Sequence, residues 1–311
     1  MSLVSPSLSV GSLLFFKFYV IIGIKGTSNF EDMLTDCCGN AVRHKFKDGP
    51  FVNGGRDEIN CHEGILLSSK RLADDLQTFV ESILLPAGFN IKVVGHSLGA
   101  GVGVIFSMIL RSRIKMLRDD TGTKLKVLAF ASPPILDYKA SVNCQDFVNT
   151  YVNNADIVPR SSLSNLAILL DQMNTMDRRL DEEGLSPKGL ASTTKYIKML
   201  ARGNKEETIM TAEQIQESIL NALEKVDIDD PDHLYVAGRV VHMYDQWTKE
   251  GYGNKSDYEG EDDETKIVKT AEKVYTADGS AKVLRLIEID DRMITDHMSA
   301  AYRASFQAML L

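Results

Sequence analysis

The sequence lacks the basic blocks, paired cysteine motifs and long apolar runs that mark several large classes of protein. Its 311 residues carry a net charge of −8, and the absence of a strongly basic stretch argues against nucleic acid as the main partner. The chain has four cysteines without the paired spacing of zinc sites. Because Cys37 and Cys38 are adjacent, they are a poor start for a disulfide framework. We therefore expect reduced thiols in an intracellular protein.

The most apolar stretch, residues 8–24, is interrupted by Lys17 and is short for a transmembrane helix. It has no basic segment before it and no convincing signal-peptide cleavage site. Its second half, residues 18–24, is rich in β-branched and aromatic side chains and predicts a buried strand. We expect a cytoplasmic or peripheral membrane protein, or one with a membrane anchor if the N-terminus is incomplete.

What is present is a globular composition, with 44% hydrophobic and 25% charged residues, enough to bury a sizeable core. An amphipathic helix is predicted from Leu72 to just before Pro86, and a second helix follows Gly99. Strands alternate with these helices, which indicates an α/β fold with a mainly parallel sheet and helices on both faces. The predicted strands of this half are residues 18–24, 90–94, 125–131 and 147–152.

The second half of the chain has a less regular pattern. Two insertions are predicted at about 172–232, which is polar and helix-prone, and at about 248–282, which begins with an acidic, exposed loop. Strand character returns at 234–243 and again at 283–289, and a C-terminal helix is expected from about Met293. The prediction is a single domain over residues 1–311 that carries these two insertions.

The strongest chemical signal is the nucleophile elbow Gly95-His96-Ser97-Leu98-Gly99, which fits the pattern G-x-S-x-G. An apolar strand precedes it and a helix rich in small residues follows, which is the context that the pattern requires. Gly95 and Gly99 leave room for a sharp turn that presents the hydroxyl of Ser97 near a helix N-terminus, where developing negative charge is favoured. The side chain of His96 is expected to point away from that hydroxyl.

A serine hydroxyl needs a base, and in folds of this kind the acid and the histidine follow the serine in the chain. Asp156 lies just past a predicted strand, at the catalytic edge of a parallel sheet, and Asp137 is its rival. Either aspartate could instead simply form a turn. Chain order leaves three histidines open: His233 in a surface-like turn, His242 inside a likely packed strand, and His297 in a late segment.

Several segments resemble the class 3 lipases in order and spacing, and the sn-1-specific diacylglycerol lipases more closely. The resemblance implies Ser97, Asp156 and His297 as a catalytic triad, and an oxyanion hole from Leu98 and Thr27. Lys25 departs from the family's usual arginine, which could weaken an ion pair. The resemblance rests on residues 24–27, 62–64, 95–101, 132–134, 156–166, 234–242 and 296–298, together with Asp32 and Asp36.

The resemblance also implies a function. It suggests a serine carboxylic ester hydrolase that cleaves acylglycerols, diacylglycerol first among them, at a membrane interface. The alternatives are a phospholipase or other lipid esterase, or a noncatalytic hydrolase-fold protein that serves as a binding or scaffold module. No cofactor is required for this chemistry. Calcium has weak support, because the acidic run 257–264 lacks the EF-hand pattern.

Overall fold

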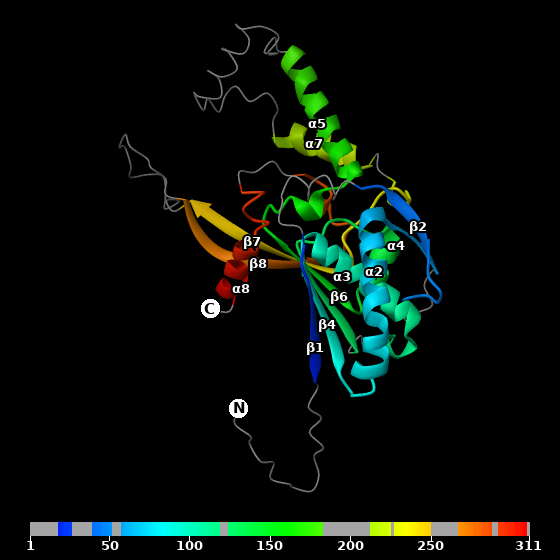
Figure 1. The fold of residues 1–311 in the computed structure, drawn as a ribbon. Coiled ribbons are helices and arrows are strands. Elements are labelled where there is room, and N and C mark those ends of the chain that lie inside the picture. The colour runs from blue at the N-terminus through cyan, green and yellow to red at the C-terminus, as the bar shows by residue number, and fades with distance from the viewer. Residues whose placement is uncertain are drawn as a thin grey trace.

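A mainly parallel β-sheet forms the centre of the molecule (Figure 1). The computed structural model describes residues 18–26, 39–51, 57–118, 124–182, 212–224, 227–249, 267–287 and 292–309. Within these residues the sheet has the strand order β1-β4-β5-β6-β7-β8, and only its last pair, β7 and β8, is antiparallel. The strands are β1 Tyr19–Ile24, β4 Asn90–His96, β5 Leu125–Phe130, β6 Val148–Asn153, β7 Arg239–Lys249 and β8 Ile267–Ala277.

Helices cover both faces of this sheet. On one face α2 (Glu63–Phe79) packs against α3 (Leu98–Arg113), which lies on β4 and β5. On the other face α8 (Ser299–Ala308) packs its Phe306 against Phe130 and Tyr151 (Figure 1). The predicted fold class, a parallel sheet between two helical layers, is therefore confirmed.

The first half of the chain departs from prediction in two places. An antiparallel hairpin of β2 (Ala41–Lys45) and β3 (Glu58–His62), which the sequence did not indicate, precedes α2. Helix α2 then begins at Glu63 rather than near Leu72, because the His62 side chain caps it by accepting from the Ile65 N–H at 3.4 Å. The predicted end before Pro86 is right: α2 runs into a short π-helix, Val80–Leu84.

Two predicted strands of the second half are misplaced. Strand β7 begins at Arg239 rather than at residue 234, because Gly238 has a φ of 77° and Tyr235 makes only an isolated bridge. The strand expected at 283–289 is wrong over its described part, residues 283–287, because Lys282–Leu284 forms a 3-10 turn that buries Leu284 against Val152. Instead β8, within the range predicted as the second insertion, ends the sheet.

The remaining elements are helical. The C-terminal helix α8 begins at Ser299, and the residues from 292 to 297 form turns rather than the helix expected from Met293. Helix α5 (Leu163–Glu182) runs into the first predicted insertion, and α7 (Ala212–Glu224) lies within it. The two helices contact each other and lie beyond one end of the sheet (Figure 1). No helix in the described residues is both long and apolar enough to span a membrane. The short elements are α4 (Tyr138–Asn143) and the 3-10 turns Lys115–Leu117 and Val158–Arg160.

Candidate active site

Ser97 occupies the turn between β4 and α3. Its φ of 58° lies in the left-handed region, and its side chain is buried. The N–H of Ser97 donates to the carbonyl of Phe130 at 2.9 Å, which fixes the turn to the end of β5. Left-handed backbone is unfavourable for a residue with a Cβ, and a strained serine between a strand and a helix is the geometry of a nucleophile elbow. The local structure around Ser97 is therefore the one that the motif predicts.

The glycines of the elbow are required by close backbone contacts. A Cβ on Gly99 would lie 2.5 Å from the carbonyl oxygen of Ile24 and 2.7 Å from the nitrogen of Gly26. A Cβ on Gly95 would overlap the carbonyl of Gly99. The chain that leaves β1 thus lies directly against the elbow, at the carboxyl edge of the sheet. Leu98 begins α3 there, whereas Thr27 lies outside the described residues.

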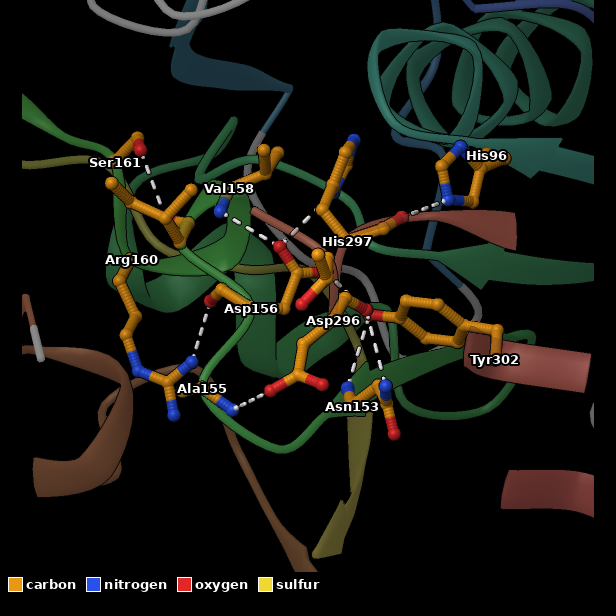
Figure 2. Close-up of polar contacts among 12 residues, drawn as sticks. His96, Asn153, Ala155, Asp156, Val158, Arg160, Ser161, Asp296, His297 and Tyr302 are labelled. Carbon is orange, nitrogen blue, oxygen red and sulfur yellow. Dashed lines mark hydrogen bonds and ion pairs between the residues drawn. The ribbon is translucent and has the colours of Figure 1, made fainter. Parts of the chain in front are cut away.

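Asp156 and His297 lie in contact although 141 positions separate them in the chain. Nδ1 of His297 is 3.0 Å from Oδ1 of Asp156, and both side chains are buried (Figure 2). A carboxylate only accepts hydrogen bonds, so Nδ1 carries the hydrogen and Nε2 is left as the basic nitrogen of the ring. The structure thus pairs His297 with an acid in the manner that a catalytic base requires.

Arg160 holds the loop that carries Asp156. The guanidinium is almost completely buried and donates to the backbone carbonyl of Asp156 (Figure 2). It also donates to the backbone carbonyls of Asn154 and Val283. A planar guanidinium with five donors suits such a role better than a lysine would. The arginine at the end of the Asp156–Arg160 segment therefore shapes the acid loop through the backbone carbonyls that it binds.

Tyr302 is a site residue that sequence reasoning missed. Its hydroxyl donates to Oδ2 of Asp156 at 2.7 Å and accepts from the Asn153 N–H at 3.0 Å. Burial, followed by the charge of Asp156, raises the pKa of Tyr302 well above its ordinary value. The phenol therefore remains a donor at all ordinary pH values. Its position one helical turn into α8 gave no sequence signal.

The segment that carries His297 is tied to the end of β6 by further polar contacts. The carboxylate of Asp296 accepts from the Ala155 N–H at 3.2 Å, and the Asn153 amide donates to the Asp296 carbonyl at 3.1 Å (Figure 2). Ser305 donates to the Asn153 side chain at 2.8 Å. These buried bonds place the turn before α8 in one position relative to the acid.

His96, inside the elbow, also contacts the His297 segment. Its Nε2 lies 2.8 Å from the carbonyl oxygen of His297, and the two rings are 4.8 Å apart. Since a carbonyl accepts, Nε2 is the protonated nitrogen. Burial and then the neighbouring His297 lower the pKa of His96, so His96 stays neutral. Through this hydrogen bond, the residue directly before Ser97 contacts the turn that carries His297.

The rival candidates have structural roles. Asp137 caps α4 by accepting from the Ala140 N–H at 2.9 Å, and also binds the Asn60 N–H. His242 is packed in β7, as expected, with Nε2 3.0 Å from the Asn154 carbonyl. The surface position expected for His233 is wrong: the side chain is buried and its ring stacks on Tyr235 at 4.6 Å. Burial lowers the pKa of His233 to about 4.

The described part of the chain contains no group of three or more acidic, histidine or cysteine side chains arranged to hold a metal ion. The acidic run 257–264 lies outside the described residues.

Comparison with known proteins assigns part of the chain to a family. Residues 21–166 match the model of the family Lipase (class 3). This segment belongs to the class 3 lipase family. The elbow and the sheet around it form the α/β-hydrolase fold of these lipases. The family match includes Ser97 and Asp156 but ends before His297.

Among relatives, the class 3 lipase segment and its surroundings are similar to diacylglycerol lipase-alpha of Rattus norvegicus, with 28% identity over 73% of this chain and 21% of that protein. Diacylglycerol lipase-beta of Mus musculus is 26% identical over 48% of this chain and 21% of its own length. The chain thus spans about a fifth of these relatives. A solved Rhizomucor miehei lipase propeptide complex is similar over 46% of this chain and 43% of that one, with 20% identity and a TM-score of 0.37.

Proposed function

We propose that the chain is a serine carboxylic ester hydrolase that cleaves acylglycerols, with diacylglycerol as its preferred substrate. The products would be a monoacylglycerol and a free fatty acid. The observation that carries the proposal is the buried pair of His297 and Asp156 beside the strained elbow of Ser97. The class 3 lipase match and the relatives named diacylglycerol lipase support the substrate class.

In the proposed mechanism Nε2 of His297 takes the proton of the Ser97 hydroxyl as Oγ attacks the ester carbonyl. Asp156 keeps the imidazole in the required tautomer and stabilises its cationic form. The imidazolium then gives its proton to the departing glyceride oxygen, which leaves an acyl-enzyme on Ser97. A water molecule, activated by His297 in the same way, releases the fatty acid. None of these reaction steps requires a cofactor.

The oxyanion of each tetrahedral intermediate would bind the Leu98 N–H and Thr27. Leu98 is the first residue of α3, so its N–H belongs to the free amide group at the helix N-terminus. The close approach of Gly26 to Gly99 supports a contribution from the chain that follows β1, where Thr27 comes next. Removing one such preorganised donor typically lowers the rate by a factor on the order of 10²–10³.

Acylglycerols reside in membranes, so the enzyme is expected to work at a lipid surface as a peripheral protein. Two exposed apolar side chains, Ile294 and Met298, flank His297. Apolar side chains exposed next to a catalytic residue favour contact with lipid over contact with water. They support a lipid rather than a soluble ester as substrate.

A hydrolysis screen tests the substrate proposal. Diacylglycerol, triacylglycerol, monoacylglycerol and phosphatidylcholine are offered in the same mixed micelles, and released fatty acid is measured. The proposal predicts the highest kcat/KM on diacylglycerol. A preference for phosphatidylcholine would replace it with a phospholipase. Absence of turnover on every ester, with no labelling of Ser97 by a fluorophosphonate probe, would favour the noncatalytic scaffold.

A further inference from the structure

A pocket of about 550 Å³ lies between the first turns of α5 and the loop that precedes β7. Its apolar surface comes from Leu163, Ala167 and Ile168 of α5 and from Ala222 of α7. None of the residues of the proposed catalytic triad lines it. A volume of this size suits a small organic molecule rather than a bare ion.

The loop gives this pocket an acidic rim. Asp227, Asp230 and Asp232 all line it, and all three side chains are exposed. No lysine or arginine is among the described residues of the lining. The other acid of the loop, Asp229, lies outside the lining and is paired with Lys139 at 2.8 Å. A concave site lined by charges of one sign concentrates ions of the opposite sign, so this pocket favours a cation.

The wall of the pocket also holds a buried ring nitrogen that lacks a hydrogen bond. His233 is 2% exposed, and its Nδ1 has no hydrogen-bond partner in the part of the chain that the structure describes. An unpaired buried polar atom is unfavourable, and a ligand that bonds to it removes this cost. Burial and then the charge of Arg285 lower the pKa of His233 to about 4, so the ring is neutral at pH 7. With its hydrogen on Nε2, a neutral imidazole presents Nδ1 as an acceptor.

These three features together describe one kind of ligand. A primary ammonium group carries a positive charge and three N–H donors, and its alkyl stem can cover apolar surface. We propose that the pocket binds a primary ammonium group on an apolar stem. The ammonium donates to Nδ1 of His233 and to the carboxylates of the acidic rim, and the stem lies against the apolar side chains of α5. Free alkylamines and the ethanolamine headgroup of a membrane lipid both present this group.

Calorimetric titration with matched small molecules tests the ligand class. The protein is the full chain with Ser97→Ala, so the result does not depend on the proposed hydrolysis. Hexylammonium is compared with 1-hexanol, which has the same stem without the charge, and with ethylammonium, which has the charge on a shorter stem. Hexylammonium should bind at least about tenfold more tightly than either, because only it uses both the rim and the apolar surface.

Two further substitutions in the Ser97→Ala background test the residues of the pocket. His233→Phe removes Nδ1 while it keeps a ring against Tyr235, and should weaken hexylammonium binding about fivefold. Asp232→Asn removes one exposed charge of the rim and should weaken it about threefold. The matched control is Asp177→Asn, an exposed aspartate of α5 that lies outside the lining, which should change binding less than about 1.5-fold because its charge is screened. Thermal unfolding midpoints establish that each variant is folded.

Vesicle flotation distinguishes the two sources of the ammonium group. Stronger binding to phosphatidylethanolamine than to phosphatidylcholine vesicles, lost in Asp232→Asn, would identify the lipid headgroup as a ligand. Tight binding of hexylammonium without that preference would identify a free amine. Equal affinity for hexylammonium and 1-hexanol would overturn the proposal. Equal losses in Asp232→Asn and Asp177→Asn, or unchanged affinity in both His233→Phe and Asp232→Asn, would also overturn it.

Discussion

Tyr302 donates its hydroxyl hydrogen to Oδ2 of Asp156 at 2.7 Å, the carboxylate oxygen that His297 does not use. Oδ1 accepts hydrogen bonds from Nδ1 of His297 and from the N–H of Val158. The buried carboxylate therefore has donors on both oxygens, which is what stabilises a charge removed from water. The acid of the proposed triad is fixed in orientation as well as in position.

Tyr302→Phe is predicted to lower kcat/KM about tenfold, because the acid loses one of the bonds that fix its orientation. It should also destabilise the protein by about 2 kcal/mol, since the Asn153 N–H loses its acceptor. Kinetics and urea unfolding measure the two effects. Phe306→Leu, in the same helix, should lower stability while leaving kcat/KM near wild type. If both variants lose activity equally, Tyr302 only supports the fold.

The histidine assignment gives a second prediction. His297→Ala should reduce turnover by several orders of magnitude, because the serine loses its base. His233→Ala should keep most activity, since its ring packs on Tyr235 rather than on the acid. His242→Ala is judged by circular dichroism first, because the ring is packed in β7. An active His297→Ala protein together with an inactive, folded His233→Ala protein would contradict the assignment.

The strands of the parallel sheet and the elbow could be predicted from sequence patterns because both depend on local features. The β-branched run before Ser97 predicts a buried strand, and the small residues after it predict a helix that packs closely on the sheet. Chain order alone left three histidines open, because the contact of His297 with Asp156 joins segments far apart in the chain. The family resemblance, not the local pattern, favoured His297.

Other features were beyond the sequence for identifiable reasons. Tyr302 reaches Asp156 through the packing of α8, which no local pattern encodes. Residues 283–287 have the apolar character of a strand, yet the burial of Leu284 in a 3-10 turn takes precedence. Tertiary contacts also bury His233, although its neighbours Asp230 and Asp232 gave it the appearance of a surface turn.

His233 should make stability depend on pH. Its folded pKa, about 4, lies below the ordinary value of 6.5, so protonation favours the unfolded chain. This contribution is fully present above about pH 6.5 and is lost as the pH falls toward 4. Between pH 7 and pH 5 the loss is about 2 kcal/mol. Urea unfolding of wild type and His233→Phe, which keeps the stacked ring, should show this difference. Parallel pH profiles would contradict the burial argument.

The elbow gives a matched pair of glycine variants. Gly99→Ala should abolish activity and lower stability by more than about 2 kcal/mol, because its Cβ would meet the backbone of Ile24 and Gly26. Gly23→Ala, in β1, should be nearly neutral since no atom lies within 4 Å of the added Cβ. Thermal unfolding and ester hydrolysis are measured on both. A fully active Gly99→Ala protein would mean that the elbow does not pack against β1 as described.

The central claim is that Ser97 is the nucleophile of a lipid ester hydrolase. The most direct measurement is diacylglycerol hydrolysis by wild-type and Ser97→Ala proteins, with fluorophosphonate labelling of each and circular dichroism to establish folding. We predict that wild type is labelled on Ser97 and releases fatty acid. Folded Ser97→Ala should be unlabelled, with turnover reduced by a factor on the order of 10⁴ or more. Near-normal turnover in folded Ser97→Ala would contradict the account.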